Sequence, residues 1–535
     1  MTDTLQDSQP ETAIKQPRGL HDVENLLLIV LVIITTVVYF RYTIQVVRWN
    51  DPIAYVYAGQ QIAETGEPVY INQYNATIGP YFTYHGFPVQ RHPGDAGLYF
   101  GVAIGFPLLL ALAHLVPLDQ ALLYLVPVLS IVGVFLLARL GRMLFGRWVG
   151  LLAAGWLAFS VDYWSLSTEN WSDVPAVTFV LAGMICAIQS SRKNSLPLGL
   201  IAGVLLGFAV LIRYPVVLAF IQLGAYLLLK RRGEVQPHRA YAGLAAGLIA
   251  LGGLNMAYSA AVFGSPLATG YAADYGFPSY ALLSWQNFIG NSPVGSGGYQ
   301  AVLAAFWHNL HIGLILAIIG LILMPRAEAL LLGGVILFVS LFFAAFLWPS
   351  SDARFALLAL PMILLAASYA IVRGCVRLFG AESRWIAVAI PLLIVLVSLP
   401  TWSATTQHLT GRSRHGEVMV ARAETIVRDT EPNAIFLSQQ YHDLIMYYGH
   451  RTALFYSLLT VPGGAATQAA WDKYAERLDS VVSQVLEDGT PVYLVKEPDT
   501  VHFRQGPIDP YPILSAAFNL QQTNQDPPVY RVLPR

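Results

Sequence analysis

Long apolar runs separated by short polar or basic segments dominate the chain. The first run, residues 25–45, has about the ~20 residues that a helix needs to cross a bilayer. No small-residue cleavage site follows it, so we expect an uncleaved first span. Further runs of spanning or near-spanning length are 98–117, 121–140, 148–161, 174–189, 196–212, 216–229, 241–263, 301–324, 329–347, 355–372 and 385–400. The pattern predicts a polytopic α-helical membrane protein with about twelve apolar helices.

Lys and Arg residues in the short loops predict which side each loop faces, because positive charges near span ends stay in the cytoplasm. The basic loops contain Arg139, Arg142 and Arg147; Arg192 and Lys193; Lys230, Arg231 and Arg232; Arg326; and Arg373, Arg377 and Arg384. We expect the amino-terminal tail, residues 1–24, in the cytoplasm; the alternative is an outward amino terminus, with both apolar runs before Arg139 crossing the membrane. The loops 47–97 and 264–300, and everything after residue 400, are then expected outside.

One apolar run does not fit this alternation. With a cytoplasmic amino terminus, only one of the two runs between the first span and Arg139 can cross. The run 98–117 contains Gly101, Gly105, Pro107 and His114. We therefore expect this run to be re-entrant or interfacial on the outer side, which leaves about eleven spans in the membrane domain, residues 25–400.

The composition changes at Thr401, after which the chain is charged and polar. Residues 434–438 and 492–496 have the pattern of strands, and residues 471–486 that of an amphipathic helix. The segment 401–535 is long enough for a small core. We expect it to form an extracytoplasmic α/β domain.

Composition and charge exclude several classes of protein. Of the 535 residues, 55% are hydrophobic and 12% charged, whereas soluble domains carry roughly a quarter charged residues. The 31 basic and 32 acidic residues give a net charge of −1, so no basic field is present to attract nucleic acid. The two cysteines, Cys186 and Cys375, cannot form a disulfide framework or a cysteine zinc site.

The scarce charges near the outer boundary are the candidate functional residues, because a charge at membrane depth is costly unless it is paired or hydrated. They are Asp51, Glu169, Asp173, Arg213, Asp352 and Arg354. Structural alternatives exist for them: Asp51 and Asp173 have positions suited to helix capping, and the two arginines to snorkelling. If the helix after Glu169 begins early, Glu169 and Asp173 share one side of it. As functional groups, the guanidinium groups would bind phosphate oxygens.

Two outer loops contain further candidates. His85, His92 and Asp95 offer ligands for a divalent metal ion, but their spacing matches no defined zinc pattern, and the identity of any metal stays open. His308 and His311 have the spacing of an interfacial helix start rather than of ligands. The loop 264–300 is rich in aromatic residues and glycine, which suits either a membrane-interface belt or a mobile flap over a site.

Five short motifs together resemble the GT-C superfamily of polytopic glycosyltransferases, and in particular its protein mannosyltransferases and lipid A aminoarabinose transferases. The motifs are Asp51 with Tyr55, Ala58 and Gly66; His92-Pro93-Gly94; Glu169 and Asp173 before Val174-Pro175; Arg213-Tyr214-Pro215; and Arg354-Phe355 to Pro361. The likeness covers roughly residues 50–360. Many members have Asp-Glu after the first span, where this chain has Asn50-Asp51.

The resemblance implies a function and a set of roles. A sugar would pass, with inversion, from a polyprenyl-phosphate donor to a hydroxyl acceptor on the extracytoplasmic face of a membrane, such as a bacterial plasma membrane. Asp51 would be the general base. Substrate binding would involve Glu169, Asp173, Arg213, Arg354, Tyr55 and His92. The resemblance makes no cofactor certain and leaves open whether a divalent metal ion takes part.

Two other classes stay open on the sequence alone. A lipid or sugar transporter would also bury a few charges. Transporters typically show duplicated halves and charges near mid-bilayer, whereas the candidate charges here are expected at one face. A non-catalytic membrane protein would place its function in the outer domain after Thr401 and would tolerate loss of Asp51.

Overall fold

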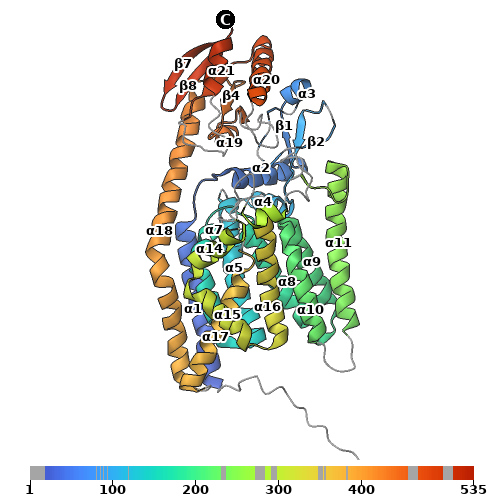
Figure 1. The fold of residues 1–535 in the computed structure, drawn as a ribbon, viewed down its shortest axis with the longest axis vertical. Coiled ribbons are helices and arrows are strands. Elements are labelled where there is room, and N and C mark those ends of the chain that lie inside the picture. The colour runs from blue at the N-terminus through green and yellow to red at the C-terminus, as the bar shows by residue number, and fades with distance from the viewer. Residues whose placement is uncertain are drawn as a thin grey trace, which may run out of the picture.

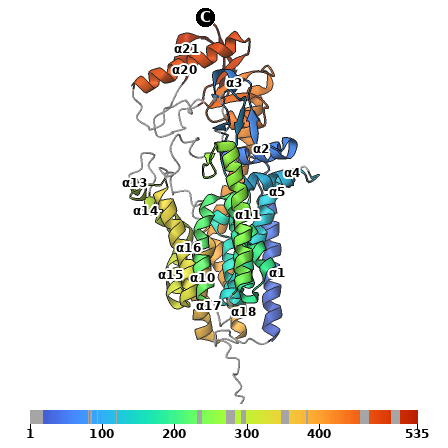
Figure 2. The same ribbon diagram turned by 90° about the vertical axis from the view of Figure 1, so that its right-hand side faces the viewer.

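Apolar helices form a bundle at one end of an elongated molecule, and a small β-sheet unit lies beyond the other end (Figure 1). The computed structural model describes residues 18–79, 81–82, 84, 86–87, 89–92, 94–118, 120–230, 237–270, 283–290, 298–346, 354, 357–380, 383–455, 468–497 and 510–535. Figure 2, turned by 90°, shows the same separation of bundle and sheet.

Seven described helices have the length and apolar composition to cross a membrane. They are α1 (Arg18–Tyr42), α5 (Ala121–Phe145), α8 (Asp173–Lys193), α11 (His238–Phe263), α16 (Arg326–Ala345), α17 (Leu360–Phe379) and α18 (Arg384–Arg428). Two bent pairs would raise the number to nine: α6 (Arg147–Ala158) with α7 (Val161–Ser167), and α14 (Gly298–Leu310) with α15 (Ile312–Leu323). Shorter apolar helices are α4 (Gly105–His114), α9 (Leu196–Ile212) and α10 (Leu218–Leu229), the last preceded by the 3-10 turn η1 (Tyr214–Val217).

These lengths differ from the predicted set of about eleven spans. The run 301–324, expected to be one span, bends by 99° between α14 and α15. The break falls at His311, whose φ of 46° lies in the left-handed region that is unusual for a residue other than glycine. The helix within the run 98–117 is the ten-residue α4, which at 1.5 Å per residue is about 15 Å long and too short to cross. This agrees with the expectation that it does not span.

Small residues bring α9 and α11 into direct backbone contact. A Cβ added to Gly199 would lie 2.2 Å from the Ala240 carbonyl oxygen, and one added to Gly203 would lie 2.3 Å from that of Leu244. Such close approach is typical of helix pairs in membranes, where packing replaces the hydrophobic effect as the driving force. The pair positions the end of α9, where Arg213 begins the next segment.

The first loop after α1 folds into a small layer above the bundle. Its helix α2 (Asn50–Thr65) lies across the bundle end, and α4 lies below it (Figure 1). Its strands β1 (Val69–Ile71), β2 (Val89–Gln90) and β3 (Gly97–Tyr99) form an antiparallel sheet in the order β1-β3-β2, and the short helix α3 (Tyr74–Ile78) follows β1.

The carboxy-terminal unit is a five-stranded mixed sheet with three helices. Its elements are β4 (Ile435–Ser438), α19 (His442–Tyr447), β5 (Thr452–Phe455), α20 (Gln468–Glu487), β6 (Val492–Val495), α21 (Pro510–Ala517), β7 (Asn519–Gln525) and β8 (Pro528–Leu533). The order is β5-β4-β6-β8-β7, with β4 parallel to both neighbours and β8 antiparallel to β6 and β7. The predicted strands and amphipathic helix are present as β4, β6 and α20.

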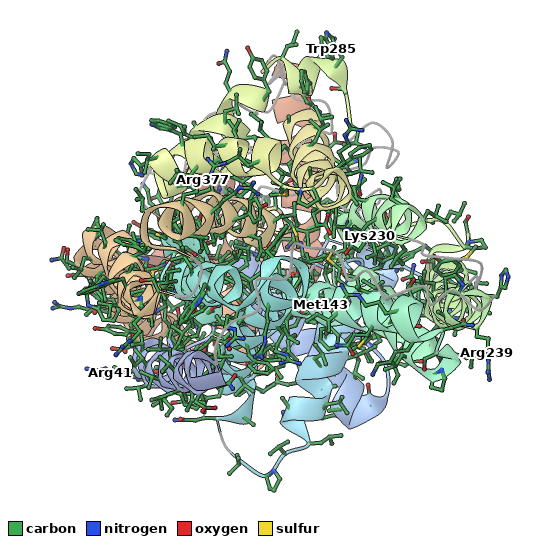
Figure 3. The ribbon with its side chains drawn as sticks, turned by 90° about the horizontal axis from the view of Figure 1, so that it is seen from below. Arg41, Met143, Lys230, Arg239, Trp285 and Arg377 are labelled. Atoms are coloured by element: carbon green, nitrogen blue, oxygen red, sulfur yellow. The ribbon has the colours of Figure 1, made fainter. Side chains whose placement is uncertain are left out.

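One continuous helix joins the bundle to this unit. α18 runs for 45 residues along the side of the molecule (Figure 1) and passes through Thr401, where a domain boundary was expected. The sheet itself begins at Ile435. Lys230 directly follows α10 and Arg239 lies in the first turn of α11, at the ends of these helices that are remote from the sheet (Figure 1). Figure 3 labels both residues in the view from below. The candidate site lies at the opposite end.

Candidate functional site

Asp51 pairs with Arg354 where α2 crosses the end of the bundle. Asp51 lies in the first turn of α2, whose N-cap position is occupied by Trp49 without a side-chain capping bond. Arg354 Nη1 donates to Asp51 Oδ2 at 2.9 Å, although the residues are 303 positions apart. The Asp51 side chain is 34% exposed and that of Arg354 18%. Asp51 is therefore an accessible, ion-paired carboxylate rather than a helix cap.

A tryptophan supports the guanidinium of this pair. Arg354 lies 4.6 Å from the ring centroid of Trp171, within cation–π range. Trp171 is buried, and its Nε1 donates to Glu169 Oε2 at 3.1 Å. The position of Arg354 thus depends on the turn before α8. Asp352, also a sequence candidate, lies outside the described residues.

A second ion pair joins Asp173 to Arg213. Arg213 follows the last residue of α9 with extended backbone, and Asp173 begins α8. Arg213 Nη1 lies 2.8 Å from Asp173 Oδ1, and it also donates to Ser172 Oγ at 3.3 Å. Asp173 is almost fully buried, while the Arg213 side chain is 20% exposed. The arginine is therefore held by a buried carboxylate instead of snorkelling alone.

Tyr55 links α2 to this second pair. Its hydroxyl accepts a hydrogen bond from Ser172 Oγ at 3.3 Å, and its ring is buried against Phe100 and Phe106. Burial, followed by the negative charge of Asp51, raises the pKa of Tyr55 to about 12. The phenol is therefore neutral at physiological pH.

Glu169 forms a third group with two arginines that the sequence did not suggest. Arg48 Nη2 lies 2.8 Å from Glu169 Oε1, and Arg412 Nε lies 3.4 Å from the same oxygen. α8 begins only at Asp173, so Glu169 precedes the helix. The early helix start that would place Glu169 and Asp173 on one side of it is therefore not observed. Arg412 comes from α18, beyond the residue at which a separate domain was expected, so only the fold brings it here.

The three groups together carry an excess of positive charge. Four guanidinium groups, from Arg48, Arg213, Arg354 and Arg412, pair with three carboxylates. Among the described residues, these printed ion pairs thus contain one more positive than negative group. Such an arrangement suits an anionic ligand, since guanidinium groups bind phosphate oxygens in charge-assisted hydrogen bonds.

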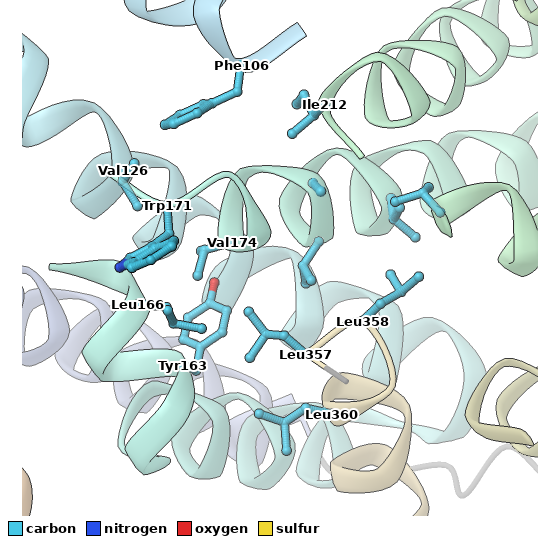
Figure 4. Packing of buried hydrophobic residues seen from close by; sticks show 14 of the residues in the cluster. Phe106, Val126, Tyr163, Leu166, Trp171, Val174, Ile212, Leu357, Leu358 and Leu360 are labelled. Atoms are coloured by element: carbon cyan, nitrogen blue, oxygen red, sulfur yellow. The ribbon is translucent and has the colours of Figure 1, made fainter. Parts of the chain in front are cut away.

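A packed core fixes the backbone beneath these charges. Buried residues close in sequence to the ion pairs include Val174 directly after Asp173, Ile212 directly before Arg213, and Leu357 three positions after Arg354. Figure 4 shows them in one cluster with residues of neighbouring helices. The apolar runs therefore position the polar network at their ends.

The comparisons with known proteins agree with this architecture. Residues 102–253 match the family model of dolichyl-phosphate-mannose-protein mannosyltransferases. The crystal structure of ArnT from Cupriavidus metallidurans bound to undecaprenyl phosphate is 14% identical, with a TM-score of 0.61 over 94% of this chain and 97% of that one. The chain has the GT-C glycosyltransferase fold. The resemblance predicted from the sequence is confirmed.

Other GT-C structures align over most of the chain. The oligosaccharyltransferase from Archaeoglobus fulgidus is 12% identical, with a TM-score of 0.56 over 89% of this chain and 69% of that one. The arabinofuranosyltransferase AftD from Mycobacteria is 11% identical, with a TM-score of 0.50 over 98% of this chain and 40% of that one. No curated protein sequence gives a significant match.

His92 and Asp95 lie outside the charged network. His92 is exposed in the turn after β2, and its backbone N–H donates to Asp95 Oδ2 at 2.9 Å. His85 lies outside the described residues. Within the part of the chain that the structure describes, no group of three or more His, Cys, Asp or Glu side chains has metal-binding geometry.

Part of the predicted flap also falls outside the described residues, at 271–282 and 291–297. Between these segments, α13 (Trp285–Phe288) stacks Trp285 on Phe288 with ring centroids 4.9 Å apart. Trp285 is 70% exposed. This end of the GT-C fold therefore presents an accessible aromatic surface.

Proposed function

We propose that the protein transfers a sugar, with inversion, from a polyprenyl-phosphate-linked donor to a hydroxyl acceptor on the extracytoplasmic face of a membrane. The observation that carries the proposal is the convergence of Asp51, Asp173 and Glu169 with four arginines at one end of the bundle. The acceptor is a glycan, lipid or protein hydroxyl group. The fold shared with a structure that holds undecaprenyl phosphate supports a lipid-phosphate donor.

Asp51 acts as the general base in this proposal. A base must reach the proton of the attacking hydroxyl group, and Asp51 is the most exposed of the three carboxylates in the network. Arg354 favours the ionised form of Asp51, because an adjacent positive charge stabilises the carboxylate. Arg354 also restricts the orientation of the carboxylate.

The second ion pair, Arg213 with Asp173, suits the stabilisation of the leaving phosphate. Inversion requires the acceptor oxygen to attack the anomeric carbon from the face opposite the leaving phosphate. The phosphate gains negative charge as its bond to the sugar breaks, and a fixed guanidinium group stabilises that charge. Arg213, held on Asp173 and partly exposed, suits this role. The hydrogen bond from Ser172 to the Tyr55 hydroxyl links the second pair to α2, the helix that carries Asp51.

The direct test is Asp51→Asn in purified protein, assayed with a panel of synthetic undecaprenyl-phosphate monosaccharides. General-base catalysis contributes typically about 10²–10⁴-fold, so transfer is expected to fall by that factor while lipid binding is retained. Glu64→Gln is the matched control, since Glu64 lies on the same helix with a 57% exposed side chain. Undiminished transfer by Asp51→Asn would overturn the base assignment.

A second measurement tests the reaction class independently of any single residue. Deleting the protein from its host should cause one lipid-linked sugar to accumulate, detectable by mass spectrometry of lipid extracts. That sugar identifies the donor. An unchanged lipid-linked sugar pool, together with no transfer by the purified protein, would argue against the glycosyltransferase function.

A further inference from the structure

One short stretch of backbone, residues 43–49, connects α1 to the helix that carries the proposed base. Asp51 lies two positions after the end of this connecting segment, in the first turn of α2. The first hydrogen bond of α2 runs from Ile53 N to the carbonyl oxygen of Trp49 at 3.1 Å. The direction in which α2 presents Asp51 is therefore set by the conformation of Trp49 and of the segment before it.

The backbone of Trp49 has an unfavourable conformation. Its φ of 70° and ψ of 144° lie in a region that bulky residues rarely adopt. Such a conformation persists only when the surrounding structure holds it. Burial of the side chain does not do so, because Trp49 is 45% exposed, and its ring contacts the guanidinium of the adjacent Arg48. The contacts of the connecting segment with the rest of the protein therefore have to hold this backbone.

Tyr448 of the carboxy-terminal unit holds the connecting segment by its backbone. The Tyr448 hydroxyl group accepts from Val47 N at 2.8 Å and donates to the Val47 carbonyl oxygen at 3.0 Å. One side chain, 401 positions away, thus bonds to both backbone groups of one residue. Burial raises the pKa of Tyr448, so the hydroxyl group keeps the proton that it donates. Tyr448 directly follows α19, which Figure 1 shows between the sheet and α2.

The bundle holds the same segment from other directions. Ile44 N donates to a backbone carbonyl of the loop before α8 at 3.0 Å, and Arg48 pairs with Glu169 in that loop. On α18, a Cβ added to Gly416 would lie 2.8 Å from Arg48 Cδ and 2.8 Å from Val46 Cγ2. Glycine at position 416 therefore lets the connecting segment lie directly against α18. Between Ile44 and Trp49, the segment is fixed by the bundle and by the carboxy-terminal unit together.

We propose that Tyr448 is a positioning residue for Asp51, through which the carboxy-terminal unit fixes the connecting segment and the start of α2. This inference rests on the proposed sugar transfer. Tyr448 touches no reacting group in it. Its hydroxyl group holds Val47, so that Trp49 keeps its unfavourable conformation and Asp51 stays in contact with Arg354. Without this hold the donor lipid still binds, but the base is presented in the wrong geometry.

The experiment compares Tyr448→Phe with Tyr447→Phe in the full-length protein purified in detergent. Phenylalanine keeps each ring and removes only the hydroxyl group. Tyr447 is the matched control, because its hydroxyl group accepts from the Gln60 side chain of α2 at 3.2 Å, nine positions beyond Asp51. Tyr448→Phe should lower kcat for sugar transfer about 10–100-fold, since small displacements of a reacting group are costly. The KM for the donor lipid and the kcat of Tyr447→Phe should change little.

The pH–rate profile separates positioning from a loss of folded protein. In Tyr448→Phe its acidic limb should move to higher pH, because Asp51 ionises less readily when it is displaced from Arg354. A smaller folded fraction would lower the rate without moving the limb. Gly416→Ala, which displaces the segment from the side of α18, should reproduce the loss of kcat and the shift. Its control is Gly411→Ala, on the same helix with open space around it.

Hydrogen exchange tests the hold on the segment without any substrate. Amides of residues 43–50 should exchange about 2–10-fold faster in Tyr448→Phe than in the wild type, since the Val47 N–H loses its acceptor. Unchanged exchange in Tyr448→Phe would overturn the inference. So would equal losses of kcat in Tyr448→Phe and Tyr447→Phe with an unmoved pH profile. If the wild type transfers no sugar while exchange rises in Tyr448→Phe, the proposed function fails, and the hold of Tyr448 on Val47 is confirmed.

Discussion

The ring of Trp171 offers a sharp test of the proposed site, because it connects two of the ion pairs without being charged itself. Arg354 stacks on its face at 4.6 Å, and its Nε1 donates to Glu169 at 3.1 Å. Trp171 touches neither substrate nor acceptor in the proposal. In the proposal it is a positioning residue that acts on Asp51 through Arg354.

The perturbation is Trp171→Leu, which removes the aromatic face and the N–H group. A cation–π contact is worth about 0.5–1 kcal/mol when exposed and about 2 kcal/mol when desolvated. Trp171 is 8% exposed and the Arg354 side chain 18%, so we place the contact at about 1–2 kcal/mol. Since 1.36 kcal/mol corresponds to tenfold in rate, kcat should fall by about 5–30-fold. Trp171→Phe, which keeps a stacking ring, should lose less.

The assay is the initial rate of sugar transfer by purified protein, with kcat and KM determined separately. A positioning role lowers kcat more than it raises KM and moves the acidic limb of the pH–rate profile, since Arg354 would hold the Asp51 charge less firmly. Trp385→Leu is the control, because Trp385 begins α18 and is 67% exposed. Thermal unfolding of each variant separates the effect from a loss of folded protein.

A double-mutant cycle decides whether Trp171 acts through Arg354. Trp171→Leu and Arg354→Lys should couple, so that the double variant loses less activity than the two single losses combined. Independent effects, additive to within about 0.3–0.5 kcal/mol, would refute the reasoning. So would Trp171→Leu with wild-type kcat.

Three further predictions concern packing, protonation and sidedness. Gly203→Leu should lower the thermal unfolding temperature strongly, because its Cβ would meet the backbone of α11 at 2.3 Å, whereas Gly252→Leu, with open space around it, should not. Burial raises the pKa of Tyr55 from 10.0 to about 12. The protonated phenol therefore stabilises the folded protein below pH 10, and this stabilisation is lost as the pH rises from 10 to 12. Tyr55→Phe should make the free energy of unfolding less pH-dependent in that window. An impermeant thiol reagent should label Gln521→Cys in intact cells but Arg239→Cys only after permeabilisation; the reverse pattern would invert the proposed orientation.

The sequence by itself determined the elements whose signals are local. A run of apolar residues must be helical in a bilayer because every backbone polar group has to be satisfied within the segment, which is why α1, α5, α8 and α16 match predicted runs. Short apolar runs in the polar carboxy-terminal segment likewise identified β4 and β6. The scarcity of charge singled out Asp51, Asp173, Arg213 and Arg354, because each is costly at its depth.

Only the tertiary structure decided which charges meet. Asp51 and Arg354 are 303 residues apart, and nothing in the local sequence links them. Arg48 and Arg412 were missed for the same reason, since the partner of each is Glu169, in a loop that α18 reaches only because it continues past Thr401. The bend at His311 was equally hidden, because apolar composition fixes that a segment is helical but not where its axis turns. Ion pairs and bends depend on how helices pack against one another, and that packing is set by contacts between distant segments.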